Sequence, residues 1–155
     1  MFMGVEQLAG RTKIANSTSS RISQPSNTWS PPPPNTFKIN CDVSFNKDMN
    51  FVGVAVVARN CHGDVFDGIN AKVHASSAFV AECLTMRIGS YLIARHGWQY
   101  VIIESDCKLS IEMINRQTPD SWEGKGIFSY IRKITEFVAN FDFACFNFLS
   151  NQVAA

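Results

Sequence analysis

The chain has 155 residues, of which 46% are hydrophobic and 17% charged, a composition typical of one folded domain and not of a disordered chain. Its 14 Lys and Arg residues stand against 13 Asp and Glu residues, so no overall basic field marks it as a nucleic-acid binder. A nucleic-acid function would have to depend on a local patch or on bound metal ions.

The cysteines and the first residues of the chain indicate where the protein acts. Five cysteines are scattered without a C-x-x-C pair, a pattern typical of reduced thiols and not of a disulfide framework or a zinc site. Residues 1–10 lack the features of a secretory signal, and no run approaches the ~18 apolar residues of a membrane span. We therefore expect an intracellular protein, cytoplasmic or nuclear, with no membrane association.

Residues 1–35 are rich in Ser, Asn, Gln and Pro and end in the four prolines 31–34. Such a composition buries too little apolar surface to order itself, and the Pro tract favours an extended polyproline spacer. We interpret residues 1–35 as a disordered or Pro-rich linker and residues 36–155 as the folded domain. The alternative for the Pro tract is a docking site for a proline-binding domain.

Three strands are predicted between residues 37 and 73. Apolar and polar residues alternate strictly in residues 37–45, which predicts a strand with one buried face and places Asp42 on its polar face. Residues 51–58 are nearly all apolar and predict a second strand. A tight reversal at residues 60–64 then leads into a third strand at residues 65–73. The short links predict an antiparallel meander.

A helix is predicted next, at about residues 78–95. Ser76 and Ser77 are candidate N-caps, and Gly97 is typical of the residue that closes a helix. Glu82 lies among large apolar residues on its own face of this helix. A lone carboxylate there is costly unless it is paired, hydrogen-bonded or bound to a cation.

A central strand follows at residues 100–105. Its first four residues are large and mostly β-branched or aromatic, which predicts a strand with layers packed on both faces. Glu104 and Asp106 stand at its carboxyl end, where α/β sheets commonly place their chemistry. If Asp106 is a ligand, acids from distant parts of the sequence should converge on it, and the two best candidates are Asp42 and Glu82.

The remaining elements complete an α/β fold. A short helix is predicted at residues 108–115, and a break at residues 117–120 separates it from a longer amphipathic helix that carries Ile127 to Val138. A last, aromatic strand is predicted at residues 141–149. The order β-β-β-α-β-α-α-β predicts a five-stranded mixed sheet with helices packed on it.

Several motifs, taken together, resemble the type 1 ribonuclease H domains, and most closely the plant branch related to retroelement reverse transcriptases. They run in order from residue 29 to residue 155, with an offset of 40 positions from Asp42 to Glu82 and of 24 positions from Glu82 to Asp106. The motifs are Trp29 with the Pro tract, Phe37–Asp42, Gly53–Asn60 with Gly63, Ala81–Leu84, His96–Gly97, Glu104–Asp106 and Asn151–Ala154.

The resemblance implies an activity and a set of ligands. It implies that two Mg²⁺ ions, replaceable by Mn²⁺, take part in cleaving the RNA strand of an RNA/DNA hybrid. By position, Asp42 would bridge both ions, and Glu82 and Asp106 would complete the shell. Hard cations need clustered carboxylates, and two ions would activate the attacking water and stabilise the leaving 3′ oxygen. We expect a monomer that recognises RNA through its 2′-hydroxyl groups.

Two departures from the family pattern bear on activity. Val43 stands where the family usually has a small residue after the first acid, although its side chain is expected to point to the buried face. Ala155 stands at the position of the family's fourth acid or histidine, and we expect the C-terminal helix that would carry that residue to be truncated.

These departures leave alternatives open. The first alternative is a catalytically defective ribonuclease H-like domain, a retroelement-derived remnant that only binds nucleic acid. The second is a truncated gene product without function. Each candidate also has a plainer interpretation, since Asp42 can be a solvated acid on a polar strand face and Asp106 can cap the helix behind it. Glu104 is interpreted as structural.

Overall fold

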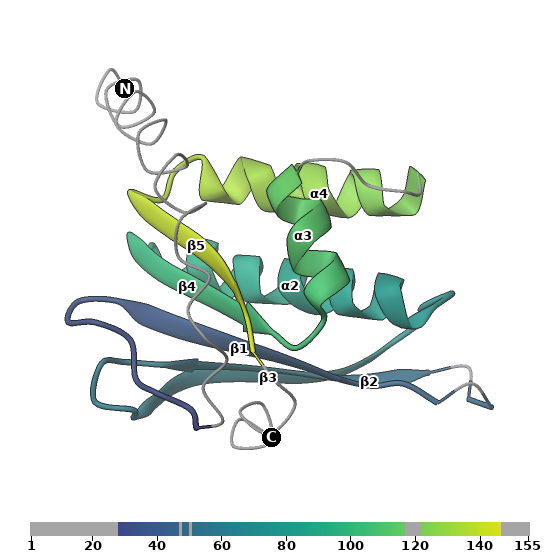
Figure 1. The fold of residues 1–155 in the computed structure, drawn as a ribbon, viewed down its shortest axis with the longest axis horizontal. Coiled ribbons are helices and arrows are strands. Elements are labelled where there is room, and N and C mark those ends of the chain that lie inside the picture. Colours follow the sequence, from purple (N-terminus) through teal and green to yellow (C-terminus); the bar gives the residue numbers. More distant parts are fainter. Residues whose placement is uncertain (1–27, 47, 50, 117–121, 147–155) are drawn as a thin grey trace.

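We analysed the fold in a computed structural model, which describes residues 28–46, 48–49, 51–116 and 122–146. The described residues form five strands and three helices in the predicted order (Figure 1). These elements are β1 (Phe37–Ser44), β2 (Val52–Arg59), β3 (Val65–Val73), α2 (Ala78–His96), β4 (Tyr100–Ser105), α3 (Lys108–Arg116), α4 (Trp122–Thr135) and β5 (Asn140–Cys145).

The strands form one mixed sheet in the order β3-β2-β1-β4-β5. The first three strands are antiparallel neighbours, whereas β1 pairs with β4, and β4 with β5, in parallel. Because β1 and β4 are parallel neighbours, their carboxyl ends lie at the same edge of the sheet. The predicted five-stranded mixed sheet is therefore confirmed.

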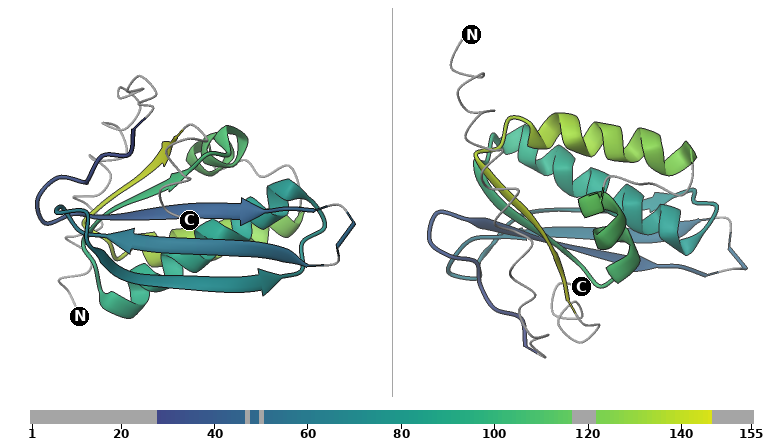
Figure 2. Two further views of the ribbon diagram at one scale, coloured as in Figure 1. Left: turned by 90° about the horizontal axis from the view of Figure 1, so that it is seen from below. Right: turned by 45° about the horizontal axis from the view of Figure 1, so that its top comes forward.

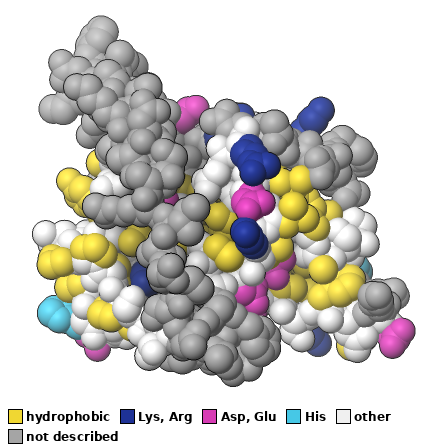
Figure 3. All heavy atoms as spheres, in the orientation of Figure 1, with side chains coloured by type: hydrophobic (Ala, Val, Ile, Leu, Met, Phe, Trp, Pro, Cys, Tyr) yellow, Lys and Arg dark blue, Asp and Glu magenta, His cyan; other side chains and the backbone are white. Residues whose placement is uncertain are grey.

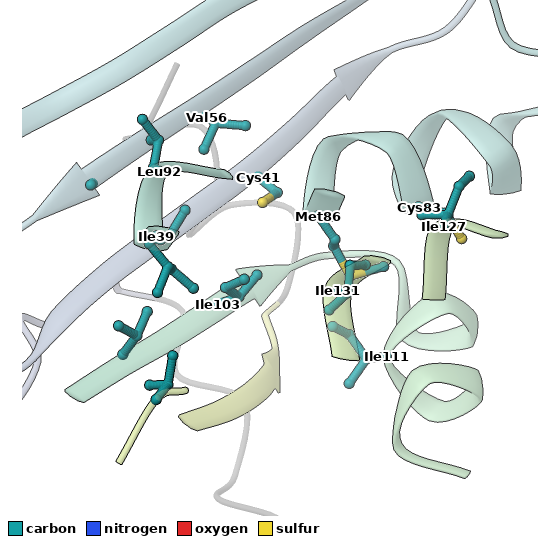
Figure 4. Packing of buried hydrophobic residues seen from close by; sticks show 14 of the residues in the cluster. Ile39, Cys41, Val56, Cys83, Met86, Leu92, Ile103, Ile111, Ile127 and Ile131 are labelled. Atoms are coloured by element: carbon teal, nitrogen blue, oxygen red, sulfur yellow. The ribbon is translucent and has the colours of Figure 1, made fainter. Parts of the chain in front are cut away.

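All three helices lie on one face of the sheet, as the ribbon shows in Figure 1 and in the turned views of Figure 2. Helix α2 packs on β1, β2 and β4, and α4 packs on α2. Ile39 and Cys41 of β1 and Ile103 of β4 meet Met86 of α2 in the core, and all four are fully buried (Figure 4). Burial of this apolar surface is the main force that holds the helices to the sheet.

A glycine brings α2 close to the sheet. A Cβ atom at Gly89 would lie 3.2 Å from Cγ2 of Ile39, which is tighter than ordinary van der Waals contact, and 3.5 Å from Sγ of Cys41. The missing side chain therefore lets the helix backbone approach β1. The distance between α2 and β1 also sets how far Glu82 lies from the end of that strand.

The ends of α2 agree with the sequence. Ser77 is the N-cap, and its side chain accepts a hydrogen bond of 3.2 Å from the Val80 amide. Gly97 has φ 65° and donates its amide to the Ile93 carbonyl at 2.8 Å. The helix runs one residue beyond the prediction, to His96.

Most other predicted boundaries hold to within one or two residues where the structure describes them, but α4 ends at Thr135, so Val138, which was predicted to lie on this helix, follows it. Helix α3 ends at Arg116, one residue beyond the prediction. Residues 147–149 of the predicted last strand, the predicted truncation of the C-terminal helix and Ala155 lie outside the described residues. None of the helices in the described part of the chain combines the length and hydropathy of a membrane span.

Two expectations about buried faces were wrong. β1 was predicted to have one buried face, but Lys38 and Asn40 on its polar face are only 4% and 1% exposed. β4 was predicted to carry a layer on both faces, but the described helices cover one face only. The other face, called here the open face, buries polar side chains of β1 and β4 because they bond to one another and to Trp29.

Candidate active site

The three predicted site residues come from three elements that end or begin at one edge of the sheet. Asp42 lies near the carboxyl end of β1, and Asp106 directly follows β4. Because β3 runs in the same direction as β1, α2 begins at that edge and places Glu82 in its first turns. The parallel pairing of β1 with β4 thus connects residues that are 64 positions apart in the sequence.

The charges of these carboxylates influence one another. Burial and, to a smaller extent, the negative charges of Asp106 and Asp42 together raise the pKa of Glu82 from 4.5 to about 7. Burial and the charge of Asp42 also raise the pKa of Asp106. The structure therefore brings Asp42, Glu82 and Asp106 within electrostatic reach of one another, and their role as metal ligands stays a prediction.

Ser105 is a part of this site that the sequence did not reveal. It is fully buried, and its hydroxyl donates a 3.2 Å hydrogen bond to Oε2 of Glu82, which opposes the rise in the pKa of that carboxyl. The same oxygen accepts the Cys107 amide at 3.1 Å. Ser105 is followed directly by Asp106, and the alternation of β4 turns it towards α2. The alternation of side chains along β4 was the sequence signal that could have identified Ser105 as part of the site.

Val43 occupies the place after the first acid without blocking the site. Its side chain is half-buried and packs in a small cluster with Val54 and Ala81, the residue before Glu82. Its amide donates a 3.0 Å hydrogen bond to Oδ1 of Asp42. The expectation that the Val43 side chain points to the buried face is confirmed.

A cavity of about 540 Å³ opens beside Asp42 on the open face. Asp42 stands in register with Ala55 of β2 and Asn70 of β3, and Ser44 stands in register with Gly53 and Lys72. The two β2 residues in this register, Ala55 and Gly53, are small, so they leave a depression in the sheet surface between the polar side chains of β1 and β3. We call this cavity the β1–β3 trough; it is lined by Asp42, Ser44, Gly53, Val54, Ala55, Asn70, Ala71 and Lys72.

Charged side chains near the end of β4 are mixed in sign. Acidic and basic side chains alternate over α3 in the space-filling view of Figure 3. Lys108 at the start of this helix lies 3.8 Å from Glu112 and is 78% exposed. Lys108 is therefore a solvated helix residue.

The donor set suits a hard divalent cation. Carboxylate oxygens are the ligands that Mg²⁺ prefers, and a cation would relieve the repulsion that raises the pKa of Glu82 and of Asp106. Among the residues that the structure describes, however, no group of three or more His, Cys, Asp or Glu side chains lies close enough to hold a metal ion. The three acids are therefore spaced more widely in this structure than the ligands of one bound ion.

Solved structures share this fold. A ribonuclease H1 from the halophilic archaeon Halobacterium salinarum superposes with a TM-score of 0.70 at 11% identity, over 77% of this chain and 91% of that chain. A ribonuclease H1 isolated from compost by a metagenomic approach gives 0.69 at 20% identity, over 77% and 90%. The crystal structure of the compost enzyme in complex with an RNA/DNA hybrid gives 0.67 at 17% identity, over 76% and 90%. At these identities the likeness establishes the fold.

Sequence comparison places the chain in a family. No curated protein is significantly similar to it in sequence. A family model described as reverse transcriptase-like matches residues 40–155, a range that includes Asp42, Glu82 and Asp106. Because this match covers most of the chain and the described residues have the ribonuclease H fold, the protein belongs to the reverse transcriptase-like family.

Proposed function

We propose that this chain is a metal-dependent endoribonuclease that hydrolyses the RNA strand of RNA/DNA hybrids. The observation that carries the proposal is the convergence of Asp42, Glu82 and Asp106 from three elements, with the raised pKa values of Glu82 and Asp106. The substrate class is supported by the family match and by the fold shared with ribonucleases H, one of which was crystallised with such a hybrid.

Asp42, Glu82 and Asp106 are the residues that would hold Mg²⁺, with Mn²⁺ as a substitute. When bound, the ions would supply an activated water and stabilisation of the leaving 3′ oxygen. The chain itself holds the carboxylates in place, since Ser105 donates to Glu82 and the Val43 amide donates to Asp42. Because Glu82 has a pKa of about 7, activity should rise with pH through neutrality as this carboxyl loses its proton.

The β1–β3 trough gives the substrate a place to approach Asp42. Lys72 at its edge can pair with a phosphate, and Ser44 and Asn70 can exchange hydrogen bonds with sugar hydroxyl groups. A local basic group of this kind, together with metal ions, would offset the lack of an overall positive field. In this proposal the RNA strand lies along the trough next to the three acids.

The proposal includes a monomer that acts inside the cell, in the cytoplasm or nucleus. An intracellular site is supported by the cysteines, because the five cysteines, all within the described residues, form no disulfide, as is typical of proteins in reducing compartments. Size-exclusion chromatography with light scattering would test the monomer.

The deciding experiment is cleavage of a labelled RNA/DNA hybrid with Mg²⁺ or Mn²⁺, with Asp42→Asn as the matched control. We expect the wild-type chain to cut the RNA strand, and the control to stay folded and inactive. Absence of cleavage at high enzyme concentration with either metal, by protein that circular dichroism shows to be folded, would overturn the nuclease proposal.

A catalytically defective domain that only binds nucleic acid is the second candidate. The observation that favours it is the spacing of the acids, because no described group of three lies at metal-binding distance. Fluorescence anisotropy of a labelled hybrid separates the two candidates. Binding that is unchanged by EDTA, without cleavage, would support the binding domain.

A further inference from the structure

Four side chains on the open face form a buried polar cluster that the proposed chemistry does not use. They are Trp29, from the segment before the first strand, Lys38 and Asn40 of β1, and Glu104 of β4; we call them the Trp29 cluster. Glu104, Asn40 and Lys38 are 0%, 1% and 4% exposed. Burial of this kind is unusual for charged residues and requires specific partners.

Every member of the Trp29 cluster is bonded to another. The Trp29 indole N–H donates to Oδ1 of Asn40 at 3.1 Å, and Nδ2 of Asn40 donates to Oε2 of Glu104 at 2.6 Å. Nζ of Lys38 lies 2.5 Å from Oε1 of Glu104 and donates to the Ser30 carbonyl at 2.6 Å. Because an indole can only donate, it fixes the orientation of the Asn40 amide and leaves Glu104 as the acceptor.

The indole ring of Trp29 packs closely against side chains and backbone of the sheet. Nζ of Lys38 lies 5.5 Å from the ring centroid, and the Arg59 guanidinium lies 5.2 Å from it. Gly63 lies against the ring edge, where a Cβ atom would come within 3.4 Å of it. These cation–π contacts and the close approach of Gly63 hold Trp29 against the sheet, although its segment reads as linker in the sequence.

The position of the Trp29 cluster relative to Asp42 and Asp106 indicates what the cluster does. The parallel pairing of β1 with β4 ends at Cys41 and Ser105. On the open face, the last paired residues are therefore Asn40 and Glu104. Asp42 and Asp106 lie two residues beyond them, where the paired register has stopped. The bond from Asn40 to Glu104 is thus the last side-chain tie between the two strands before the acids.

From this arrangement we infer that the Trp29 cluster is a positioning device, which holds the ends of β1 and β4 so that Asp42 and Asp106 keep a fixed spacing, and that Trp29 is part of the folded domain. The link to catalysis depends on the proposed function, whereas the positional claim does not. Buried ion pairs add little net stability compared with apolar replacements, so stability alone is a poor reason for this cluster.

Two mild variants test the positioning role. Trp29→Phe keeps a ring over Lys38 but removes the N–H that bonds to Asn40. The double variant Lys38→Met with Glu104→Gln removes both charges and keeps an acceptor for Asn40. The matched control is Asp67→Asn, which removes the charge that His96 contacts at 2.6 Å near the start of β3, at the opposite edge of the sheet.

Three measurements are made on each variant. They are the amide ¹H–¹⁵N shifts of Asp42 and Asp106 without metal, the affinity for Mn²⁺, and kcat and KM on the hybrid. For both test variants we expect shifted amides at Asp42 and Asp106, Mn²⁺ affinity reduced on the order of tenfold, and a lower kcat at unchanged KM. The control should change none of these.

The outcomes separate this inference from the proposed function. If a test variant melts at a lower temperature but keeps the wild-type amide shifts and Mn²⁺ affinity, the cluster only stabilises the fold and the positioning role is overturned. If the wild-type chain neither binds Mn²⁺ nor cleaves the hybrid, the proposed function fails. In that case the amide shifts of Asp42 and Asp106 alone test whether the Trp29 cluster fixes the positions of these two residues.

Discussion

The two faces of the sheet bury their residues by different means. On the helix face, Ile39, Cys41 and Ile103 are fully buried against apolar side chains of α2 and α4. On the open face, Asn40 and Glu104 are just as buried, but each is held by directed bonds to a named partner. Apolar contacts depend little on direction and contribute stability, whereas hydrogen bonds fix where a side chain points.

The candidate active site lies where these two faces meet. Glu82 comes from the helix face, since α2 carries it, and Asp42 comes from the polar side of β1. The comparison indicates a division of roles, in which the helix face supplies the free energy of folding and the open face supplies the geometry of the acids. The following predictions would sharpen or break this division.

The largest effect is expected for Glu82→Gln. The change keeps the shape of the side chain but removes a charged ligand, so we expect it to lower kcat by roughly a thousandfold, on the order of 4 kcal/mol. Hybrid cleavage with Mg²⁺ measures it. Glu112→Gln, the same chemical change on exposed α3, is the control and should leave the rate unchanged. Equal activity of the two variants would remove Glu82 from the site.

Ile39→Ala should have the largest effect on stability. Ile39 is fully buried at the closest approach of α2, so truncation should lower the free energy of unfolding by about 3 kcal/mol through lost burial and a new cavity. Urea unfolding measures the change. Val65→Ala, at a position 63% exposed, should cost less than about 0.5 kcal/mol. Similar losses for both would contradict the role given to the helix face.

The stability of the metal-free protein should fall as the pH rises. The pKa of Glu82 and that of Glu104 are both raised by burial, from 4.5 to about 7, so folding takes up protons between these values. The added stability is fully present below about pH 4.5 and is lost as the pH rises through about 7, by on the order of 1–3 kcal/mol.

Urea unfolding at pH 5 and pH 8 in EDTA measures this loss. Glu82→Gln should flatten the pH dependence and stabilise the fold at pH 8. Saturating Mg²⁺ should raise the stability of the wild type at pH 8 and leave that of Glu82→Gln nearly unchanged. Greater stability at pH 8 than at pH 5 without metal would show that Glu82 and Glu104 do not dominate the pH dependence of stability.

The smallest effect is expected at the edge of the β1–β3 trough. Lys72→Met should weaken hybrid binding roughly three- to tenfold, because one phosphate contact is lost, and should reduce the salt dependence. Anisotropy titrations in Ca²⁺, at two salt concentrations, give both values. Lys125→Met on the exposed side of α4 is the control. Equal losses in the two variants would mean that the trough does not contact the substrate.

Local patterns in the sequence determined the elements of this protein. The alternation in residues 37–45 and the change of period near Ser77 predicted β1 and the start of α2 closely. Side-chain period and capping depend on residues near one another in the chain, so they can be identified without knowledge of the fold. The three acids were identified from their order and spacing together with the resemblance to ribonuclease H.

Only the tertiary structure decided which polar residues are buried. Trp29 reads as part of a linker, and Lys38 and Asn40 read as the solvated face of a strand. Their partner Glu104 lies 64 residues after Asn40, and the two meet only because β1 and β4 pair in parallel. Burial of a polar group depends on partners brought together by long-range pairing, which the local pattern of a single strand does not contain.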